Sequence, residues 1–315
     1  MNTAHELLTQ YQVRKTKKQK RAFIRYATEK ANALGYRSVS VEKGKWKSEN
    51  IVVGNVGSAK VVFTAHYDTC PVLPFPNFIT PKNIWLYLLY QVGLSVFLIA
   101  LMGAVSLAVL RLLLLVGGTG PVWDILIDFL PMIASLSVLF ILLMGPANRH
   151  TANDNTSGVL TLFEIMAALP EERRAEVAFV FFDLEEMGML GSASFASRHK
   201  NAMRGKLLVN FDCVSDGKEV LLYVKKQARG FVPLLERAFA HDGTMRVEVA
   251  TKGVIYPSDQ MMFPCGVGVA TFKKTKGGLL YMNRIHTPRD VIFEEENIRF
   301  LTKGALALCE ILAKE

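Results

Sequence analysis

The sequence predicts a layered α/β domain with a mixed, mostly parallel sheet, which a long apolar hairpin interrupts. Short apolar segments alternate with helical segments along most of the 315 residues, and this alternation is typical of α/β domains. Two long uncharged runs lie inside the pattern and contribute much of a hydrophobic content of 50%. Such a composition excludes a disordered chain.

The first polar part, residues 1–82, begins with a segment of helical periodicity. The pattern predicts one basic amphipathic helix to about Leu34, ended by Gly35, and then short strands at 50–54 and 60–65. The basic run from Arg14 to Arg21 has two interpretations, a solvated helix face or a surface against anionic lipid headgroups. No aromatic or motif signal for nucleic-acid binding accompanies the net charge of +9.

The second polar part continues the same alternation from residue 147 to residue 315. The four cysteines of the chain, Cys70 in the first part and three in the second, lie far apart without a CxxC pair, which excludes a disulfide scaffold and a zinc ribbon. Because no internal repeat is visible, we expect 1–82 and 147–315 to form one discontinuous domain, with 83–146 inserted. The predicted helices are 157–168, 190–199, 231–240 and one from about 295, and the predicted strands are 177–182, 207–211, 220–224, 246–249 and 267–272.

The inserted segment contains two runs without charge, from Asn83 to Leu110 and from Phe129 to Asn148. At about 1.5 Å per helical residue, each run is long enough for a hydrocarbon core of roughly 30 Å. The turn between them is GGTGP, with Asp124 and Asp128 nearby. Two buried core helices are the alternative, but core helices of this length usually keep a polar face. The sequence therefore predicts a transmembrane hairpin that contacts the lipid bilayer through 84–116 and 125–145.

The charges next to the hairpin predict its orientation. Lys82 and Arg149 stand nearest its two ends, and basic flanks stay in the cytoplasm. The beginning of the chain is polar and then strongly basic, unlike a signal peptide, and such a segment resists translocation. We therefore expect a multi-pass membrane protein with two spans, and with the catalytic domain and both termini in the cytoplasm.

Five short segments at or near the ends of predicted strands contain residues that bind metals. Each has an ordinary interpretation when taken singly, such as a helix N-cap for TANDNTSG or a helix start for FFDLEEMGMLGS. Five such coincidences are far less expected, because open α/β sheets place their sites at strand ends. The segments are TAHYDT with His66 and Asp68, TANDNTSG with Asp154, FFDLEEMGMLGS with Glu185 and Glu186, NFDCVSDG with Asp212, and RIHTPRD with His286.

Together these side chains form a donor set suited to two zinc ions. Imidazole and carboxylate both suit Zn²⁺, and one carboxylate can bridge a pair of ions. A further carboxylate that is not a ligand can act as general base toward a metal-activated water. Cobalt, manganese and other divalent ions remain open, because the ligand types alone do not select among them.

The five segments, in this order, resemble those of the family 28 zinc metallopeptidases, which are co-catalytic aminopeptidases. The resemblance covers roughly residues 20–82 and 147–315 and implies a phosphorylase/hydrolase-like three-layer sandwich. It also implies a role for each matching residue. His66 and Glu186 would bind one zinc, Asp212 and His286 the other, Asp154 would bridge them, Glu185 would be the general base, and Asp68 would orient the imidazole of His66.

Two features depart from the family pattern. Where the family commonly has Ser-Asp-His, this chain has Ser258-Asp259-Gln260, which leaves the effect of Gln260 on the substrate pocket open. Tyr256 resembles a tyrosine that stabilises the oxyanion in some relatives, although its spacing is imperfect. The hairpin is a larger departure, because it separates His66 from Asp154. These two residues meet at the same metals only if the intervening chain crosses the membrane an even number of times.

The resemblance implies a membrane-anchored di-zinc exopeptidase, an aminopeptidase or dipeptidase, that hydrolyses N-terminal bonds of short peptides. Two alternatives remain open: a glutaminyl-cyclase-like acyltransferase, and a non-catalytic membrane scaffold that keeps the peptidase fold. A cyclase needs only one metal, so a filled second metal site would count against it. The physiological substrate, the residue preference and the oligomeric state are not predicted.

Overall fold

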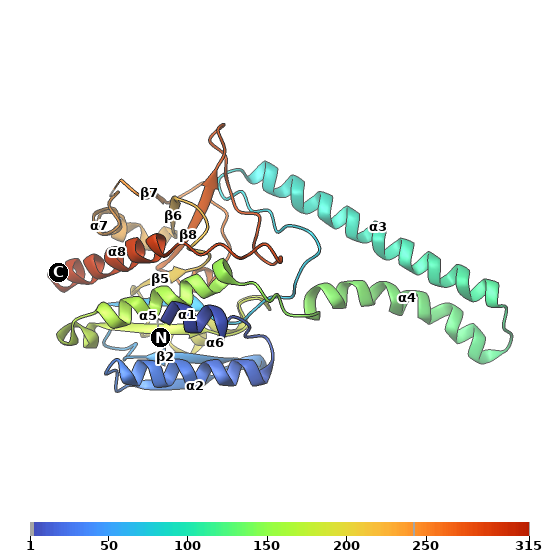
Figure 1. The fold of residues 1–315 in the computed structure, drawn as a ribbon, viewed down its shortest axis with the longest axis horizontal. Helices are drawn as coiled ribbons and strands as arrows, with labels where there is room; N and C mark the ends of the chain where they lie inside the picture. Colours follow the sequence, from blue (N-terminus) through green and yellow to red (C-terminus); the bar gives the residue numbers. More distant parts are fainter. Residues whose placement is uncertain (1–2, 242, 315) are drawn as a thin grey trace.

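One mixed sheet dominates the computed structural model, which describes residues 3–241 and 243–314 (Figure 1). The strand order is β1-β2-β4-β3-β5-β8-β6-β7, with β9 paired to β8. The four central strands β4, β3, β5 and β8 are parallel, which confirms the predicted α/β class. The strands are β1 (Val39–Lys43), β2 (Glu49–Val53), β3 (Val61–His66), β4 (Val177–Phe182), β5 (Leu207–Phe211), β6 (Glu219–Val224), β7 (Arg246–Ala250), β8 (Gly266–Lys274) and β9 (Leu280–Tyr281).

Helices cover both faces of this sheet, because alternate side chains of each strand point to opposite faces. In β4, Phe179 and Phe181 join the larger hydrophobic core. Val180 and Phe182 join a smaller core with Phe195 of α6 (Leu190–Arg198) on the other face. The helices of the larger core are α1 (Thr3–Thr9), α2 (Lys17–Ala33), α5 (Gly158–Ala168), α7 (Val232–Ala238) and α8 (Glu295–Lys314).

The beginning of the chain differs from the prediction of one helix to Leu34. Two helices, α1 and α2, are separated by residues 10–16, and Thr16 caps α2. Its hydroxyl accepts the N–H of Gln19, while the Gln19 side chain accepts the N–H of Thr16. This reciprocal pair is a capping box, which fixes a helix start. Strands β1 and β9 were also not predicted, whereas the other predicted elements correspond to those observed.

Arg14 is the exception to the interpretation of the basic run as a solvated or lipid-facing surface, because Lys17, Lys18 and Arg21 are exposed on α2. Its side chain is fully buried in the segment between α1 and α2. The guanidinium donates hydrogen bonds to the carbonyl oxygens of Tyr67 and Tyr11 and to the hydroxyl of Thr156. Carbonyl groups can replace water as partners for a buried cation, so this arginine packs beneath the strand ends.

Two helices, α3 (Ile84–Val116) and α4 (Pro121–Met144), extend side by side away from the sheet (Figure 1). At about 1.5 Å per residue they are about 50 Å and about 36 Å long. Both are long and apolar enough to cross a membrane, and only 6% of the most apolar window of each is buried. Asp124 and Asp128, expected near the turn, lie within α4 because that helix already begins at Pro121.

The chain segments that enter and leave the hairpin are paired, and we call residues 70–72 and 146–148 the neck. Val72 N–H donates to Pro146 O at 2.9 Å, and Asn148 N–H donates to Cys70 O at 3.0 Å. Pro71 and Ala147 form an antiparallel bridge between these bonds. The neck directly follows the segment of His66 and Asp68, so the base of the hairpin lies close to those residues in the chain.

Candidate metal centre

The five predicted segments meet at one edge of the sheet. His66 ends β3, and Asp212 follows β5. Glu185 and Glu186 come shortly after β4. Since β4, β3 and β5 are adjacent parallel strands, their carboxyl ends lie at the same edge. Asp154 reaches this edge from the turn Ala152–Ser157 that leads into α5, and His286 reaches it from the loop after β9.

Asp154 faces both histidines. Its Oδ1 lies 3.2 Å from His66 Nε2, and its Oδ2 lies 2.9 Å from His286 Nε2. Asp212 Oδ1 lies 3.5 Å from His66 Nε2, whereas Glu186 Oε2 lies 3.3 Å from His286 Nε2. The two groups therefore share Asp154, as a bridging carboxylate requires. We call His66, Asp154 and Asp212 the first subsite, and His286, Asp154 and Glu186 the second.

This grouping by contact differs from the pairing that the family resemblance implied, although the ligand atoms of His66, Glu185 and Glu186 also lie within 4.8 Å of one another. Glu186 was expected with His66, and Asp212 with His286, but the direct contacts pair them the other way. The reason lies in the strand order. Asp212 follows β5, which is hydrogen-bonded to β3, the strand that ends at His66. Glu186 lies in the loop after β4, where it contacts His286.

Asp68 holds both His66 and the two glutamates. Its Oδ1 lies 3.5 Å from His66 Nδ1. The same carboxylate accepts the backbone N–H groups of Glu185 at 3.0 Å and of Glu186 at 3.3 Å. This is the position that the predicted orienting role requires, because an acceptor on one ring nitrogen presents the other nitrogen to a metal.

The electrostatics of the edge favour bound cations. Burial raises the pKa of Glu185 well above its usual range, and neighbouring Glu186 and Asp212 raise it further. Burial also raises the pKa of Glu186 to about 8, although His286 opposes the shift. Within the described part of the chain, Oε1 of Glu186 is buried without a hydrogen-bond partner, and the carboxylates of Asp68 and Asp154 lie near the ring nitrogens of His66 without hydrogen-bond geometry. Such groups are rarely left unpaired, and nitrogen with carboxylate donors fits Zn²⁺.

Asp290 is a further site residue that the sequence analysis missed. Its carboxylate accepts the backbone N–H groups of Asn153 at 2.8 Å and of Asp154 at 3.0 Å. It therefore fixes the turn that presents the shared carboxylate. Asp290 belongs to the same RIHTPRD segment as His286, and an acid four residues after a predicted ligand was the available signal.

Gln260, at the position of the usual histidine, has a structural role. It is fully buried, its Oε1 accepts from Asn210 Nδ2 at 3.1 Å, and its Nε2 donates to Tyr256 O at 2.8 Å. The Tyr256 hydroxyl in turn donates to the backbone oxygen of Asp212 at 3.1 Å. Gln260 therefore ties the Tyr256 loop to β5, while the oxyanion role of Tyr256 stays a prediction.

A cavity of about 160 Å³ adjoins the metal-binding residues. Tyr87, from the first turn of α3, lines it together with Asn77 and Ile79 from the segment before α3. Ile79 is held by paired backbone hydrogen bonds with Met282. The Tyr90 hydroxyl, one turn beyond Tyr87, donates to Pro76 O. The base of the hairpin is therefore part of the wall of this cavity.

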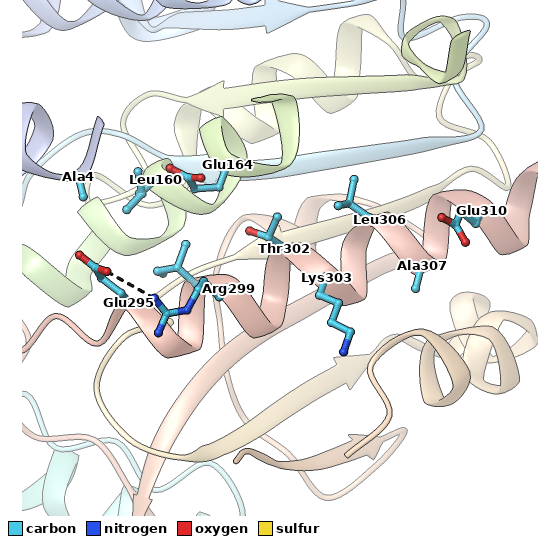
Figure 2. A pocket seen from close by; sticks show the side chains of 11 residues that line it. Ala4, Leu160, Glu164, Glu295, Arg299, Thr302, Lys303, Leu306, Ala307 and Glu310 are labelled. Carbon is cyan, nitrogen blue, oxygen red and sulfur yellow. Dashed lines mark ion pairs between the residues drawn. The ribbon is translucent and has the colours of Figure 1, made fainter. Parts of the chain in front are cut away.

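A larger cavity of about 680 Å³ lies elsewhere, between α5 and α8 (Figure 2). Leu160 and Glu164 of α5 face Thr302 and Leu306 of α8 across it (Figure 2). An ion pair of 3.6 Å between Glu295 and Arg299 lies along the first turns of α8 at one end of the cavity (Figure 2). The residues that line it differ from those of the metal edge. This cavity therefore lies at the packing interface of α5 and α8, and the candidate metal-binding residues adjoin the smaller cavity.

A layered α/β fold with clustered histidines and carboxylates at its carboxyl edge is typical of metal-dependent hydrolases. Comparison with known families agrees. The model of peptidase family M28 matches residues 135–308, which is more than half of the chain, and the chain belongs to this family. The match begins inside α4 and thus confirms the family for the part after the hairpin, while His66 and Asp68 lie before it.

Solved structures show the same fold over nearly the whole chain. The Legionella pneumophila LapA aminopeptidase is 15% identical, with a TM-score of 0.56, and covers 99% of this chain and 70% of its own. A Porphyromonas gingivalis glutaminyl cyclase is also 15% identical at a TM-score of 0.56, covering 98% of both chains. A Zn-dependent exopeptidase from Parabacteroides distasonis is 13% identical at 0.55, covering 99% and 96%. No curated protein matches the sequence.

Proposed function

We propose that this chain is a membrane-anchored di-zinc exopeptidase that removes N-terminal residues from short peptides. The observation that carries the proposal is the shared carboxylate of Asp154, whose two oxygens face His66 at 3.2 Å and His286 at 2.9 Å. A carboxylate between two clusters of donors suits a pair of metal ions better than a single ion. Family membership and the fold of an exopeptidase support the same conclusion.

In this proposal the first subsite holds one zinc ion and the second subsite holds the other. Zinc in such a centre supplies Lewis acidity toward a carbonyl group and lowers the pKa of water. Glu185 accepts the proton of the attacking water and passes it to the amine that leaves when the peptide bond breaks. Asp68 keeps His66 and the backbone of Glu185 in place during both transfers.

We further propose that 1–82 and 147–315 form one catalytic domain and that 83–146 is a membrane anchor inserted into it. The interleaved strand order supports the single domain, because β4 from the second part lies between β2 and β3 from the first. Length, hydropathy and exposure of α3 and α4 support the anchor. Lys82 and Arg149 at its base support a cytoplasmic catalytic domain with both termini on that side.

The small cavity supports a short peptide with a compact apolar first residue as the substrate. Ile79, Tyr87 and Ile285 contribute apolar surface next to the acidic edge. An apolar wall beside the ligands can hold the first side chain of the peptide, while the excess of carboxylates around the ligands attracts its terminal amine. Since Tyr87 belongs to α3, the substrate would bind beside the base of the hairpin.

The test uses detergent-purified full-length protein with three measurements: metal content, hydrolysis of amino-acyl anilides, and the same assays on Glu185→Gln. We expect about two zinc ions per chain and an activity that Glu185→Gln lowers by about 10²- to 10⁴-fold while the metal stays bound. Glu172→Gln, on the exposed segment Glu171–Glu176, is the matched control and should behave as wild type. Absence of tightly bound metal and of turnover would contradict the proposal and favour a scaffold.

A glutaminyl-cyclase-like acyltransferase is the second candidate. The similarity in fold to the cyclase of Porphyromonas gingivalis, equal in TM-score to that of the aminopeptidase, favours it. The same preparation distinguishes the two. One metal per chain, no anilide cleavage and cyclisation of an N-terminal glutamine would replace the exopeptidase by the cyclase.

A further inference from the structure

Cys70 lies beside the second subsite, although neither its sequence context nor the family resemblance assigns it a role. Its thiol is fully buried. Its sulfur and the ligand atoms of Glu186 and His286 all lie within 4.8 Å of one another. The neck holds it there, because the Cys70 carbonyl accepts the N–H of Asn148 at 3.0 Å. The thiol thus faces a donor pair that the sheet edge has already assembled.

Glu186 gives independent support for a cation at this position. Its side chain is only 8% exposed, and among the described residues its Oε1 has no hydrogen-bond partner. An unpaired buried carboxylate oxygen is costly. A cation bound between Glu186 and His286 would pair this oxygen, and the sulfur of Cys70 lies within reach of the same point.

The other buried cysteine near the centre is engaged differently. Cys213 donates its S–H to Asp212 Oδ1 at 3.1 Å, so its sulfur contacts a ligand of the first subsite as a hydrogen-bond donor. Cys70 Sγ, in contrast, lies within 4.8 Å of the ligand atoms of Glu186 and His286, in a position to act as a ligand itself. Cys213 therefore hydrogen-bonds to a ligand of the first subsite, whereas Cys70 lies where a ligand of the second subsite would lie.

We propose that Cys70 is a thiolate ligand of the second subsite, which then has sulfur, nitrogen and oxygen donors from Cys70, His286, Glu186 and the shared Asp154. The inference rests on the metal centre of the proposed function. On binding, the S–H bond of Cys70 breaks, a sulfur–metal bond forms, and the proton leaves to solvent. A thiolate selects zinc, cobalt or cadmium over magnesium and manganese. The first subsite keeps only nitrogen and oxygen donors.

Cobalt substitution of the full-length protein tests this ligand by a signal other than activity. The detergent-purified protein is freed of metal with a chelator and titrated with Co²⁺. We expect a sulfur-to-cobalt charge-transfer band in the near ultraviolet that grows with one of the two bound equivalents. The band should vanish in Cys70→Ser, and the affinity for that equivalent should fall at least about tenfold. Cys309→Ala, a buried cysteine in α8, is the control and should retain the band.

Three outcomes would overturn the proposal, and they are distinguishable from failure of the metal centre. Two bound cobalt ions without the band would refute the thiolate ligand alone. A band that survives in Cys70→Ser but disappears in Cys213→Ser would assign the sulfur to the first subsite. A protein that binds no cobalt at all would refute both this inference and the proposed function.

X-ray absorption on the zinc-loaded wild type keeps the test decisive even if Cys70→Ser fails to fold. With two zinc ions and one thiolate, the averaged zinc environment should contain one sulfur per two ions, at about 2.3 Å. An environment with only nitrogen and oxygen neighbours would contradict the proposal. Thermal unfolding of the metal-free wild type and Cys70→Ser should coincide if the residue acts through the metal.

Discussion

Strand β4 and helix α3 are both rich in apolar residues but have opposite surroundings. All six residues of β4 are buried between two layers of helices. Among the described residues, none of the 33 in α3 is buried. Composition alone therefore does not decide where a hydrophobic segment lies. β4 finds its apolar partners within the chain, whereas α3 needs partners from outside it, which we propose to be lipid.

The sharpest test of this difference is one substitution made in both regions. Phe181 in β4 is fully buried and packs against Phe163 at 5.1 Å between ring centroids, whereas Phe97 in α3 is 55% exposed. We expect Phe181→Ala to lower the free energy of unfolding by about 3–5 kcal/mol, because it leaves a cavity. Phe97→Ala should change it by less than about 0.5 kcal/mol. Urea unfolding in detergent measures both changes in the free energy of unfolding. Equal changes would contradict the difference in surroundings between β4 and α3.

A charge placed in α3 tests whether its outer partner is lipid. Ile99 lies near the middle of α3 and is 69% exposed. In a membrane, Ile99→Lys would disfavour insertion by about 2.5–3.5 kcal/mol, the cost of a lysine at the centre of a span. We expect a larger fraction of this variant to be released by alkaline extraction of membranes. Val116→Lys, at the exposed end of α3, is the matched control with a smaller effect. Unchanged retention of Ile99→Lys would argue against a span.

Tyr87 tests the contact between α3 and the candidate metal centre, because its side chain lines the cavity from α3. Removal of its ring in Tyr87→Ala should raise KM for amino-acyl anilides about tenfold, or about 1.4 kcal/mol, with little change in kcat. Trp85 belongs to the same turn but is 79% exposed, so Trp85→Ala should leave both constants unchanged. Equal effects of the two substitutions would mean that the hairpin does not contribute to substrate binding.

The smallest effect is expected at an ion pair on the boundary itself. Lys82, just before α3, contacts Glu248 of β7 at 2.7 Å, and both side chains are more than 40% exposed. Exposed pairs contribute about 0–1 kcal/mol. A double-mutant cycle with Lys82→Ala and Glu248→Ala should therefore give a coupling energy within this range. A larger value would mean that this pair, rather than packing around Tyr90, fixes the base of the hairpin.

Much of the architecture follows from local patterns, while the arrangement of the site does not. Hydropathy alone predicts β3, β4 and both long helices, because each is a continuous apolar segment. Most of the ligand residues are recognisable because they are close to the end of a strand or the start of a helix, whereas His286 lies in a loop between β9 and α8. Which carboxylate lies nearest to which histidine depends on the order of the strands in space, so local patterns did not predict that Asp212 contacts His66 and Glu186 contacts His286.

Arg14 and Cys70 show the same limit for single residues. Arg14 occurs in a basic run and looks like a surface residue, but its partners Tyr67 and Thr156 are 53 and 142 positions away in the chain. Cys70 gives no signal by spacing, because its neighbours Glu186 and His286 come from distant segments. Periodicity reports which face of an element is apolar, and it contains no information about such long-range contacts.

The sheet order also has a consequence for biosynthesis. β4 lies between β2 and β3, yet the ribosome makes it only after β3, α3 and α4. During synthesis β2 and β3 therefore lack β4, the strand that lies between them in the sheet. The pairing of β4 with β2 and β3 is non-local in the chain, and such pairing forms slowly. The two apolar helices leave the ribosome before the edge with Asp154, Glu185 and Asp212 exists. A nascent chain thus completes the hairpin of α3 and α4 first, and the candidate metal centre can assemble only on a chain that already contains this hairpin.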